Sequence, residues 1–251
     1  MKSLEVLFAP AEFAALARRD LRDTDCVVFD ILRATSTMVT ALHNGAEGVV
    51  PVQEIPEAIA LRDKHPGILL AGERDGVRIQ GDRAGGIAFD LGNSPCEFTR
   101  DRVAGKRIAA TTTNGTRALR ACAPARTVLA GSFLNLRATA DFLLQLGPQH
   151  LLLVCAGTHD QAAYEDVLCA GALCDLLWTQ LAGARIADSA LISRKLFQME
   201  QADLASAFAH TRNGASLMSL PELREDLPFC AQRDIFPLVA RLESDGVVRR
   251  R

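Results

Sequence analysis

The segment Cys26-Val27-Val28-Phe29-Asp30-Ile31-Leu32-Arg33-Ala34-Thr35-Ser36-Thr37 decides how the rest of the chain is interpreted. Its apolar run ends on an acid, an arginine and three hydroxyl residues follow, and an amphipathic stretch begins at Met38. This order predicts a strand, a loop and the start of a helix. A carboxylate at the end of a strand can bind a divalent cation, and the free N–H groups of a helix start can bind an anion. The two together indicate phosphate chemistry.

The same alternation of apolar runs and amphipathic segments continues along most of the chain. We expect strands at residues 4–8, 26–29, 48–52, 68–72, 107–111, 127–130 and 150–155, and helices at residues 11–19, 35–44, 56–64, 115–122, 136–146 and 165–181. Residues 75–93 are expected to form a small hairpin outside the core, and residues 249–251 a frayed tail.

This alternation predicts an α/β fold with a mainly parallel sheet covered by helices on both faces. From about residue 183 the pattern changes, and a mostly helical C-terminal portion is expected. Because the sequence contains no linker or internal repeat, we expect residues 1–251 to form a single domain.

The composition is that of an ordinary globular protein, with 49% hydrophobic and 23% charged residues. The net charge of -2 and the aromatic content of 5% give no reason to expect nucleic acid or a membrane as partner. No signal-like segment or membrane-spanning apolar run is found, so a cytoplasmic protein is expected. The seven cysteines are scattered without a C-x-x-C pair, which favours reduced thiols over disulfides or structural zinc.

Polar residues follow five of the expected strands at the point where each strand ends. The carboxyl ends of parallel strands meet at one edge of a sheet, and open α/β sheets bind their ligands there. We therefore expect these loops to converge, although serine, threonine and asparagine also cap helices without any ligand. The residues concerned are Asp30, Arg33, Glu73, Arg74, Thr111, Thr112, Thr113, Asn114, Ser132, Asn135 and Thr158.

The most unusual of these loops is Thr111-Thr112-Thr113-Asn114-Gly115-Thr116-Arg117. Its hydroxyl groups, its amide and the start of the following helix are suited to hold phosphoryl or carboxylate oxygens. It lacks the lysine of a Walker A loop, and the chain has no G-x-G-x-x-G motif for a dinucleotide. The competing interpretation is a threonine-rich strand end with an ordinary helix cap.

Five acidic residues are candidate ligands of a magnesium ion: Asp30, Glu73, Asp90, Glu165 and Asp166. Magnesium binds oxygen ligands, usually one or two carboxylates with water and phosphate oxygens completing the octahedron. Asp30 and Glu73 rank first because each follows an apolar strand. Turn chemistry alone would explain Asp90, and the helix dipole alone would explain Glu165 and Asp166.

Arg33 and Arg74 each follow a strand-end acid closely. Arginine suits the bidentate recognition of phosphate, carboxylate or sulfonate, but each could also simply pair with its neighbouring acid. His159 is a candidate proton donor. His43 lies inside an expected helix and is more typical of a packed or solvated histidine.

Several strings, in this order along the chain, resemble the 2-phosphosulfolactate phosphatase (ComB) family. The stretch from Asp30 to Thr37 is similar to the D-x-L-R-A-T-S-T signature of that family. The matching strings extend from about Asp25 to Gly171, and their occurrence in this order identifies the family far more specifically than any one of them alone. The other matching strings are Gly72-Glu73-Arg74, Phe89-Asp90-Leu91-Gly92-Asn93-Ser94-Pro95, Thr111 to Thr116, Gly131-Ser132-Phe133-Leu134-Asn135, Cys155-Ala156-Gly157-Thr158 and Glu165-Asp166-Val167-Leu168-Cys169-Ala170-Gly171.

The resemblance implies a magnesium-dependent phosphatase that converts 2-phospho-3-sulfolactate, a small phosphorylated acid, to 3-sulfolactate and phosphate, a step toward coenzyme M. Asp30, Arg33, Glu73 and Asn114 are the expected catalytic residues. Asp30 and Glu73 are the expected metal ligands, with Asp90 as an additional candidate. The expected substrate contacts are Thr35, Ser36, Thr37, Arg74, Asn93, Ser94, Thr111, Thr112, Thr113, Gly115, Thr116, Ser132, Asn135 and Thr158. The segment 78–88 is longer than the segment that joins Gly-Glu-Arg to the Asp-Leu-Gly-Asn-Ser loop in most of the family. If this segment borders the site, a different substrate preference is expected.

The nucleophile and the substrate stay open at this stage. A metal-bound water is preferred over Asp30, because Leu32 stands where the haloacid-dehalogenase pattern D-x-D-x-T has its second aspartate. The alternatives are a phosphatase for another 2-phospho carboxylic acid, a non-catalytic phosphate-ester binding protein, and a metal-dependent lyase or aldolase with His159 as base. The oligomeric state is also open, with a homodimer as one option.

Overall fold

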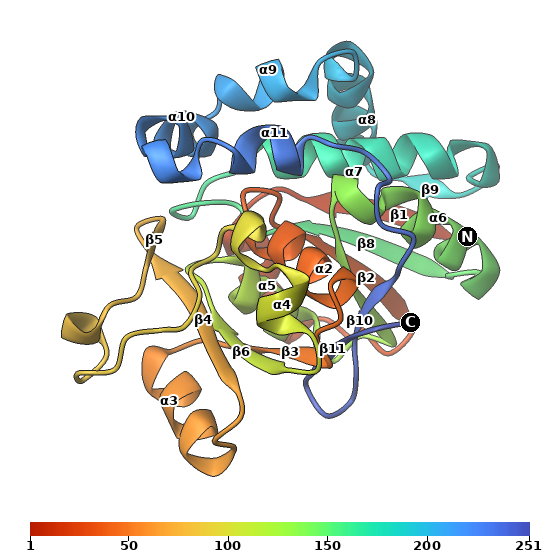
Figure 1. The fold of residues 1–251 in the computed structure, drawn as a ribbon. Coiled ribbons are helices and arrows are strands. Elements are labelled where there is room, and N and C mark those ends of the chain that lie inside the picture. Colours follow the sequence, from red (N-terminus) through yellow and green to blue (C-terminus); the bar gives the residue numbers. More distant parts are fainter.

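The computed structural model describes residues 1–251. Its eleven-stranded sheet has the order β5-β4-β6-β3-β11-β10-β7-β2-β8-β1-β9 (Figure 1). One parallel group consists of β4 (Leu69–Arg74), β6 (Arg107–Thr111) and β3 (Gly48–Val52). The other consists of β7 (Thr127–Gly131), β2 (Thr24–Phe29), β8 (His150–Cys155), β1 (Ser3–Leu7) and β9 (Arg185–Ile186). The predicted mainly parallel α/β sheet is confirmed.

A C-terminal hairpin joins the two parallel groups. Its strand β10 (Ala240–Leu242) pairs antiparallel with β7, and its strand β11 (Val248–Arg250) pairs antiparallel with β3. The expectation of a frayed tail at residues 249–251 is therefore wrong. The missed signal is the Asp245-Gly246 pair, a common hairpin turn between apolar runs, in which Gly246 has a φ of 79°.

Helices cover both faces of the sheet, as predicted. On β2, Val27 and Phe29 pack with α6 (Leu136–Leu146) and α7 (Tyr164–Leu177). The alternate residues Cys26 and Val28 belong to a second cluster with α1 (Pro10–Ala14) and α5 (Gly115–Cys122). A smaller third cluster lies beneath α3 (Ile55–Lys64). Because strand side chains alternate between faces, this strand is buried on both sides.

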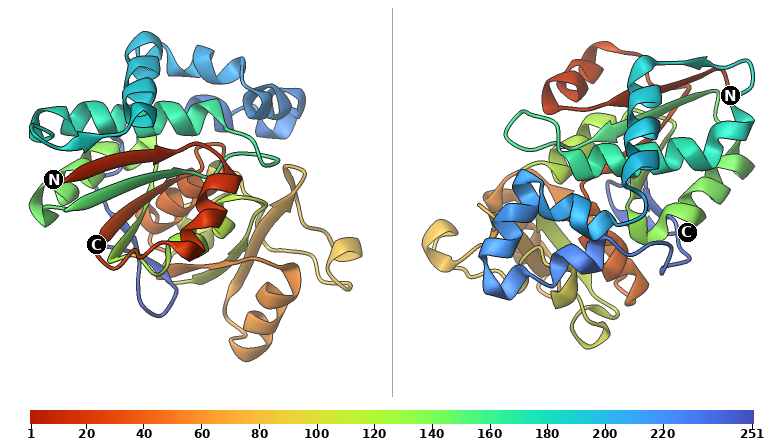
Figure 2. Two further views of the ribbon diagram at one scale, coloured as in Figure 1. Left: turned by 180° about the vertical axis from the view of Figure 1, so that it is seen from behind. Right: turned by 90° about the horizontal axis from the view of Figure 1, so that it is seen from above.

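The C-terminal helices lie on the same side of the sheet as α7, and the first of them packs directly on α7 (Figures 1 and 2). They are α8 (Asp188–Glu200), α9 (Leu204–Ala209), α10 (Arg212–Ser219) and α11 (Asp226–Cys230). Close packing of α8 on α7 requires Gly171, because a Cβ there would lie 2.0 Å from the carbonyl oxygen of Ser193. No helix combines the length and the apolar character needed to cross a membrane.

Smaller elements connect these parts. The helix expected at residues 11–19 is split into α1 and the 3₁₀ turn Ala15–Arg18. Residues 75–93 contribute β5 (Val77–Arg78), which forms an antiparallel hairpin with β4. The expectation that this segment lies outside the core is wrong, because Ile79, Ala84 and Phe89 are buried in the third cluster. The sequence analysis missed the short helix α4 (Arg100–Val103). The helix α2 (Ala34–His43) follows β2 directly, as the opening segment predicts.

Candidate functional site

A cavity of about 290 Å³ lies at the carboxyl ends of β2, β4, β6 and β8, next to α10. The loops that follow these four strands supply most of its lining, so four of the five loops predicted to converge at one edge of the sheet do so. The lining residues are Asp30, Leu32, Arg33, Glu73, Asp75, Gly76, Asn93, Thr112, Thr113, Asn114, Gly157, Thr158, His159, Asn213, Ser216 and Leu217.

Asp30 lies at the end of β2, where the chain turns into α2. Its Oδ1 accepts a hydrogen bond of 3.0 Å from the N–H of Ala34. Gly115 packs against it so tightly that a Cβ there would be 2.6 Å from Oδ2. Burial raises the pKa of Asp30 to about 7, and the negative charges of Glu73 and Glu165 add to this effect. A cation in the cavity would therefore be strongly favoured beside this carboxyl group.

Glu73 connects two of the loops. Its Oε1 accepts hydrogen bonds of 3.0 Å from both the N–H and the hydroxyl of Thr113, and its Oε2 accepts one of 2.8 Å from the N–H of Gly76. Glu73 thus fixes the β4–β5 turn against the threonine-rich loop. Oε2, which accepts only one hydrogen bond, keeps acceptor capacity for a further ligand.

Arg33 is only 4% exposed, and two acceptors fix its guanidinium. Its Nη1 donates to Oδ2 of Asp226 at 2.7 Å, and its Nη2 donates to the carbonyl oxygen of Gly76 at 2.7 Å. The other oxygen of Asp226 accepts from the hydroxyl of Ser94. Two of the five N–H groups of Arg33 are thereby occupied, and the others stay available to a ligand in the cavity.

The two acids at the start of α7 lie behind the cavity and do not line it. Asp166 accepts from the N–H of Ile31 at 2.8 Å and from the N–H of Gly157 at 3.1 Å, which links the ends of β2 and β8. Glu165 accepts from Asn213 at 2.5 Å through Oε1, while its buried Oε2 has no hydrogen-bond partner. Burial raises the pKa of both acids.

The threonine-rich loop is divided between the cavity and the protein interior. Thr112, Thr113 and Asn114 line the cavity as predicted. Thr111 instead donates its hydroxyl to the carbonyl oxygen of Gln53 at 3.0 Å. Thr116 donates to the carbonyl oxygen of Thr112 at 3.0 Å, inside the first turn of α5. Only the middle of this loop can therefore contact a ligand directly.

Arg74 does not line the cavity. Its guanidinium donates to the carbonyl oxygen of its neighbour Glu73 at 2.7 Å and to the hydroxyl of Thr111 at 3.1 Å. The expectation that Arg74 contacts the substrate is therefore not supported by the structure. Of the two arginines predicted to bind acidic groups of the substrate, only Arg33 lines the cavity.

The hydroxyl groups at the start of α2 do not line the cavity either. Thr35 donates to the carbonyl oxygen of Asp30 at 3.0 Å, Ser36 to that of Ile31 at 2.9 Å and Thr37 to that of Asn93 at 2.7 Å. The N–H of Thr35 is also bonded, to the carbonyl oxygen of Asp30. In this structure the three hydroxyl groups thus satisfy backbone carbonyl groups, and those of Thr35 and Ser36 hold the loop of Asp30 in place.

Four further predicted residues lie outside the cavity. Ser132 and Asn135 are fully buried and hydrogen-bonded to each other at the start of α6, where Asn135 also donates to the carbonyl oxygen of Leu238 at 3.3 Å. Asp90 accepts from the N–H of Leu70 at 2.8 Å and is outside the cavity. Both observations match the alternative interpretation of caps and turns. Ser94 reaches the site only through Asp226.

The C-terminal portion supplies residues that the sequence analysis did not identify. Asn213, Ser216 and Leu217 of α10 line the cavity, and Asp226 of α11 holds Arg33. Asn213 also donates to the hydroxyl of Thr158 at 2.9 Å. These residues lie up to 193 positions after the loops that they contact. No sequence motif or periodic pattern links positions so far apart.

The donor set fits a hydrated magnesium ion better than a metal held by protein ligands alone. No group of three or more histidine, cysteine, aspartate or glutamate side chains converges on one point. Asp30 and Glu73 both line the cavity, and Oδ2 of Asp30 accepts no hydrogen bond from the protein. One or two carboxylates with water and substrate oxygens are a common environment for magnesium.

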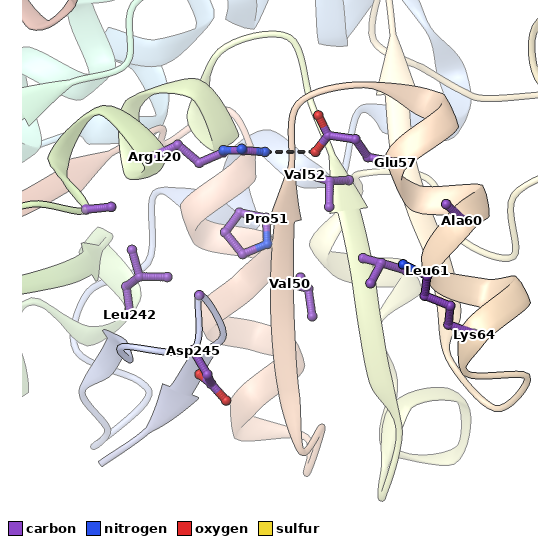
Figure 3. A pocket seen from close by; sticks show the side chains of 12 residues that line it. Val50, Pro51, Val52, Glu57, Ala60, Leu61, Lys64, Arg120, Leu242 and Asp245 are labelled. Atoms are coloured by element: carbon purple, nitrogen blue, oxygen red, sulfur yellow. Dashed lines mark hydrogen bonds and ion pairs between the residues drawn. The ribbon is translucent and has the colours of Figure 1, made fainter. Parts of the chain in front are cut away.

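A larger hollow of about 620 Å³ lies between α3, α5 and the β10–β11 hairpin (Figure 3). Figure 3 shows its apolar floor on β3 and the ion pair of 2.8 Å between Arg120 and Glu57 at its rim. Half of its lining is hydrophobic, and the strand-end acids are absent from it. The smaller cavity therefore remains the candidate site.

Comparison with known proteins gives a consistent result. A sequence model of the 2-phosphosulpholactate phosphatase family matches residues 13–245. A protein of Caldicellulosiruptor saccharolyticus named "Probable 2-phosphosulfolactate phosphatase" is 36% identical over 228 residues, which cover 89% of this chain and 91% of the relative. A protein of the same name from Caldanaerobacter subterraneus is 40% identical over 235 residues, which cover 92% of each chain.

Proposed function

Because the chain belongs to the 2-phosphosulpholactate phosphatase family, we propose that it hydrolyses the phosphate monoester of a small 2-hydroxy acid. The first expected substrate is 2-phospho-3-sulfolactate, and the products would be 3-sulfolactate and phosphate, as in the route to coenzyme M. The observation that carries the proposal is the meeting of Asp30, Arg33, Glu73 and Asn114 at one cavity. Its volume of about 290 Å³ suits a small acid.

Magnesium is the proposed cofactor, because the cavity is short of positive charge. Asp30, Glu73 and Asp75 line it, whereas Arg33 is its only arginine and no lysine is present. A substrate with a phosphate and further acidic groups would be repelled by this lining. A divalent cation held by Asp30 and Glu73 would reverse the charge balance. When bound, magnesium would neutralise charge on the phosphate oxygens as a Lewis acid.

The residues of the chain bind and orient the phosphate group. Arg33 is fixed by Asp226 and Gly76, so its remaining N–H groups are pre-oriented for phosphate oxygens. Thr112 and Asn114 add neutral donors. Phosphoryl transfer depends mainly on such positioning and on electrostatic stabilisation. We propose water as the nucleophile; hydrolysis in ¹⁸O-labelled water under single-turnover conditions should place the label in phosphate and not in Asp30.

The position of Arg74 gives a specific reason to test a second substrate class. Because Arg74 is turned toward Thr111, a sulfonate in the cavity would have no second arginine to bind. Its remaining partners would be neutral side chains such as Asn93, Asn213 and Ser216. Other 2-phospho carboxylic acids, such as 2-phospholactate, are therefore included as candidate substrates.

The deciding experiment is a phosphate-release assay with phosphosulfolactate, phospholactate and phosphoglycerate, with and without magnesium. We expect release that depends on magnesium and is fastest with phosphosulfolactate, and loss of release in Asp30→Asn. Binding of these esters without phosphate release would instead indicate a binding protein. Products of carbon–carbon cleavage would indicate a lyase or aldolase.

A further inference from the structure

The turn after β8 carries an unusual residue into the cavity. Thr158 and Gln161 form a pair of hydrogen bonds, of 2.8 Å from the N–H of Thr158 and of 3.0 Å from the N–H of Gln161. The two residues between them, His159 and Asp160, have φ angles of 49° and 59°. Two successive left-handed residues define a type I′ turn, which normally contains asparagine, aspartate or glycine. A histidine at the first of these positions therefore carries backbone strain.

Contacts from α10 fix this turn relative to the site. Arg212 donates to the side chain of Gln161 at 2.7 Å and to the carbonyl oxygen of Thr158 at 3.0 Å. Asn213 donates to the hydroxyl of Thr158 at 2.9 Å. The turn is thus held on both of its sides by one helix. Strain that is retained in a fixed turn beside a cavity is a reason to look for a function of the strained residue.

His159 is the only histidine that lines the cavity, where it joins Asp30, Arg33 and Glu73. Its side chain is also exposed to solvent, so it can exchange protons with water. Histidine is the side chain best suited to give and take a proton near neutral pH. Hydrolysis of an alkyl phosphate releases an alkoxide, which is a poor leaving group unless it receives a proton. Arg33 cannot supply this proton, because arginine does not deprotonate in proteins.

We propose that His159 is a catalytic residue of the phosphatase, the general acid that protonates the ester oxygen as the alcohol leaves. The proposal rests on the proposed function. Water supplies the oxygen that bonds to phosphorus and releases one proton to solvent. The bond between phosphorus and the ester oxygen breaks, its electron pair stays on that oxygen, and the oxygen takes the proton of the His159 imidazolium. Solvent then protonates the neutral imidazole again, so one ester and one water give one alcohol and one phosphate.

The test compares His159→Asn with the matched control Asp160→Asn. Both positions are exposed and left-handed, and asparagine adopts this conformation readily, so both variants should keep a Tm at or above that of the wild type. Asp160 does not line the cavity, so its variant should keep the wild-type kinetics.

Each protein is assayed with magnesium on 2-phospholactate and on its 3,3,3-trifluoro analogue, which has the same charge and a much more acidic leaving alcohol. Loss of a general acid should lower kcat of His159→Asn on 2-phospholactate by about 100-fold or more, and on the trifluoro ester by much less. Equal losses on both esters, or no loss on either, would overturn the assignment while leaving the phosphatase proposal intact. Absence of phosphate release by the wild-type protein from phosphosulfolactate as well as from both of these esters would overturn both proposals.

Discussion

Nη1 of Arg33 lies 2.7 Å from Oδ2 of Asp226, and the two side chains are 3% and 1% exposed. This ion pair connects the loop after β2 with α11, so the C-terminal helices take part in shaping the site. A charge that loses its partner in such an environment is much more costly than one at the surface. Asp226 therefore sets both the stability of this region and the direction of the Arg33 guanidinium.

Replacement of this partner gives the first prediction. Asp226→Ala should lower the free energy of unfolding by about 3 to 5 kcal/mol, because it leaves a buried guanidinium unpaired. Asp226→Asn should retain a hydrogen bond to Arg33, lose less stability, and raise KM more than it lowers kcat. Urea unfolding and steady-state kinetics measure these changes. Glu225→Gln, at the exposed neighbouring position, should behave as the wild type. If Glu225→Gln changed stability and KM as much as Asp226→Asn does, Asp226 would not be the residue that fixes Arg33.

The raised pKa of Asp30 predicts how stability depends on pH in the absence of magnesium. Unfolding lowers this pKa from about 7 to its ordinary value of 3.8, so the folded state binds more protons between these two values. The free energy of unfolding should consequently fall as pH rises through this window, by up to about 4 kcal/mol from Asp30 alone. Urea unfolding in a chelator at about pH 5 and about pH 8 measures the part of this fall above pH 5, about 2 to 3 kcal/mol. In Asp30→Asn the fall should be smaller; an unchanged fall would show that Asp30 does not cause it.

Magnesium should stabilise the folded protein through the same carboxylates. A ligand that binds only the folded state raises Tm, by an amount that grows with the logarithm of its concentration relative to its Kd. We expect magnesium to raise the Tm of the wild type, and to have little effect on Asp30→Asn or Glu73→Gln. Asp90→Asn serves as the control, because its side chain bonds to the N–H of Leu70 outside the cavity. If the Asp90 variant also lost its response, Asp90 would be a ligand after all.

The close contact between Gly115 and Asp30 gives a prediction about packing. In Gly115→Ala the new methyl group would lie 2.6 Å from both Oδ2 of Asp30 and the Cβ of Ala34. Overpacking of this kind costs about 1 to 3 kcal/mol, and here it would also displace a proposed catalytic carboxylate. The Tm, measured by thermal unfolding, and the kcat should both be lower than in the wild type. Gly67→Ala is the matched control, because a Cβ at Gly67 meets no atom within 4 Å.

Much of the fold could be predicted from the sequence because the strands and helices follow simple rules. The apolar run before Asp30 forms β2, and the strand-end rule placed Asp30, Glu73 and Asn114 at one cavity. These predictions depend on local periodicity and on the general topology of parallel sheets. They need no knowledge of distant contacts.

The errors arise where one residue type serves two physical purposes. Thr35, Ser36 and Asn135 have the chemistry of ligand-binding residues, but they satisfy backbone groups of their own loops. The sequence cannot distinguish the two uses, because the same donors and acceptors are involved. The contributions of Asn213 and Asp226 depend on tertiary contacts across many positions, for which one sequence carries no periodic signal.

The C-terminal hairpin has a consequence for the order in which the protein folds. β3 and β7 do not pair with each other, and only β10 and β11 lie between them. Asp30 belongs to one side of this seam, and Glu73 and Thr113 to the other. A chain still on the ribosome can complete each parallel group, but its sheet stays in two parts until residues 240–250 have emerged. The Asp30 side and the Glu73 side of the site are therefore joined through the sheet only after residues 240–250 have been synthesised.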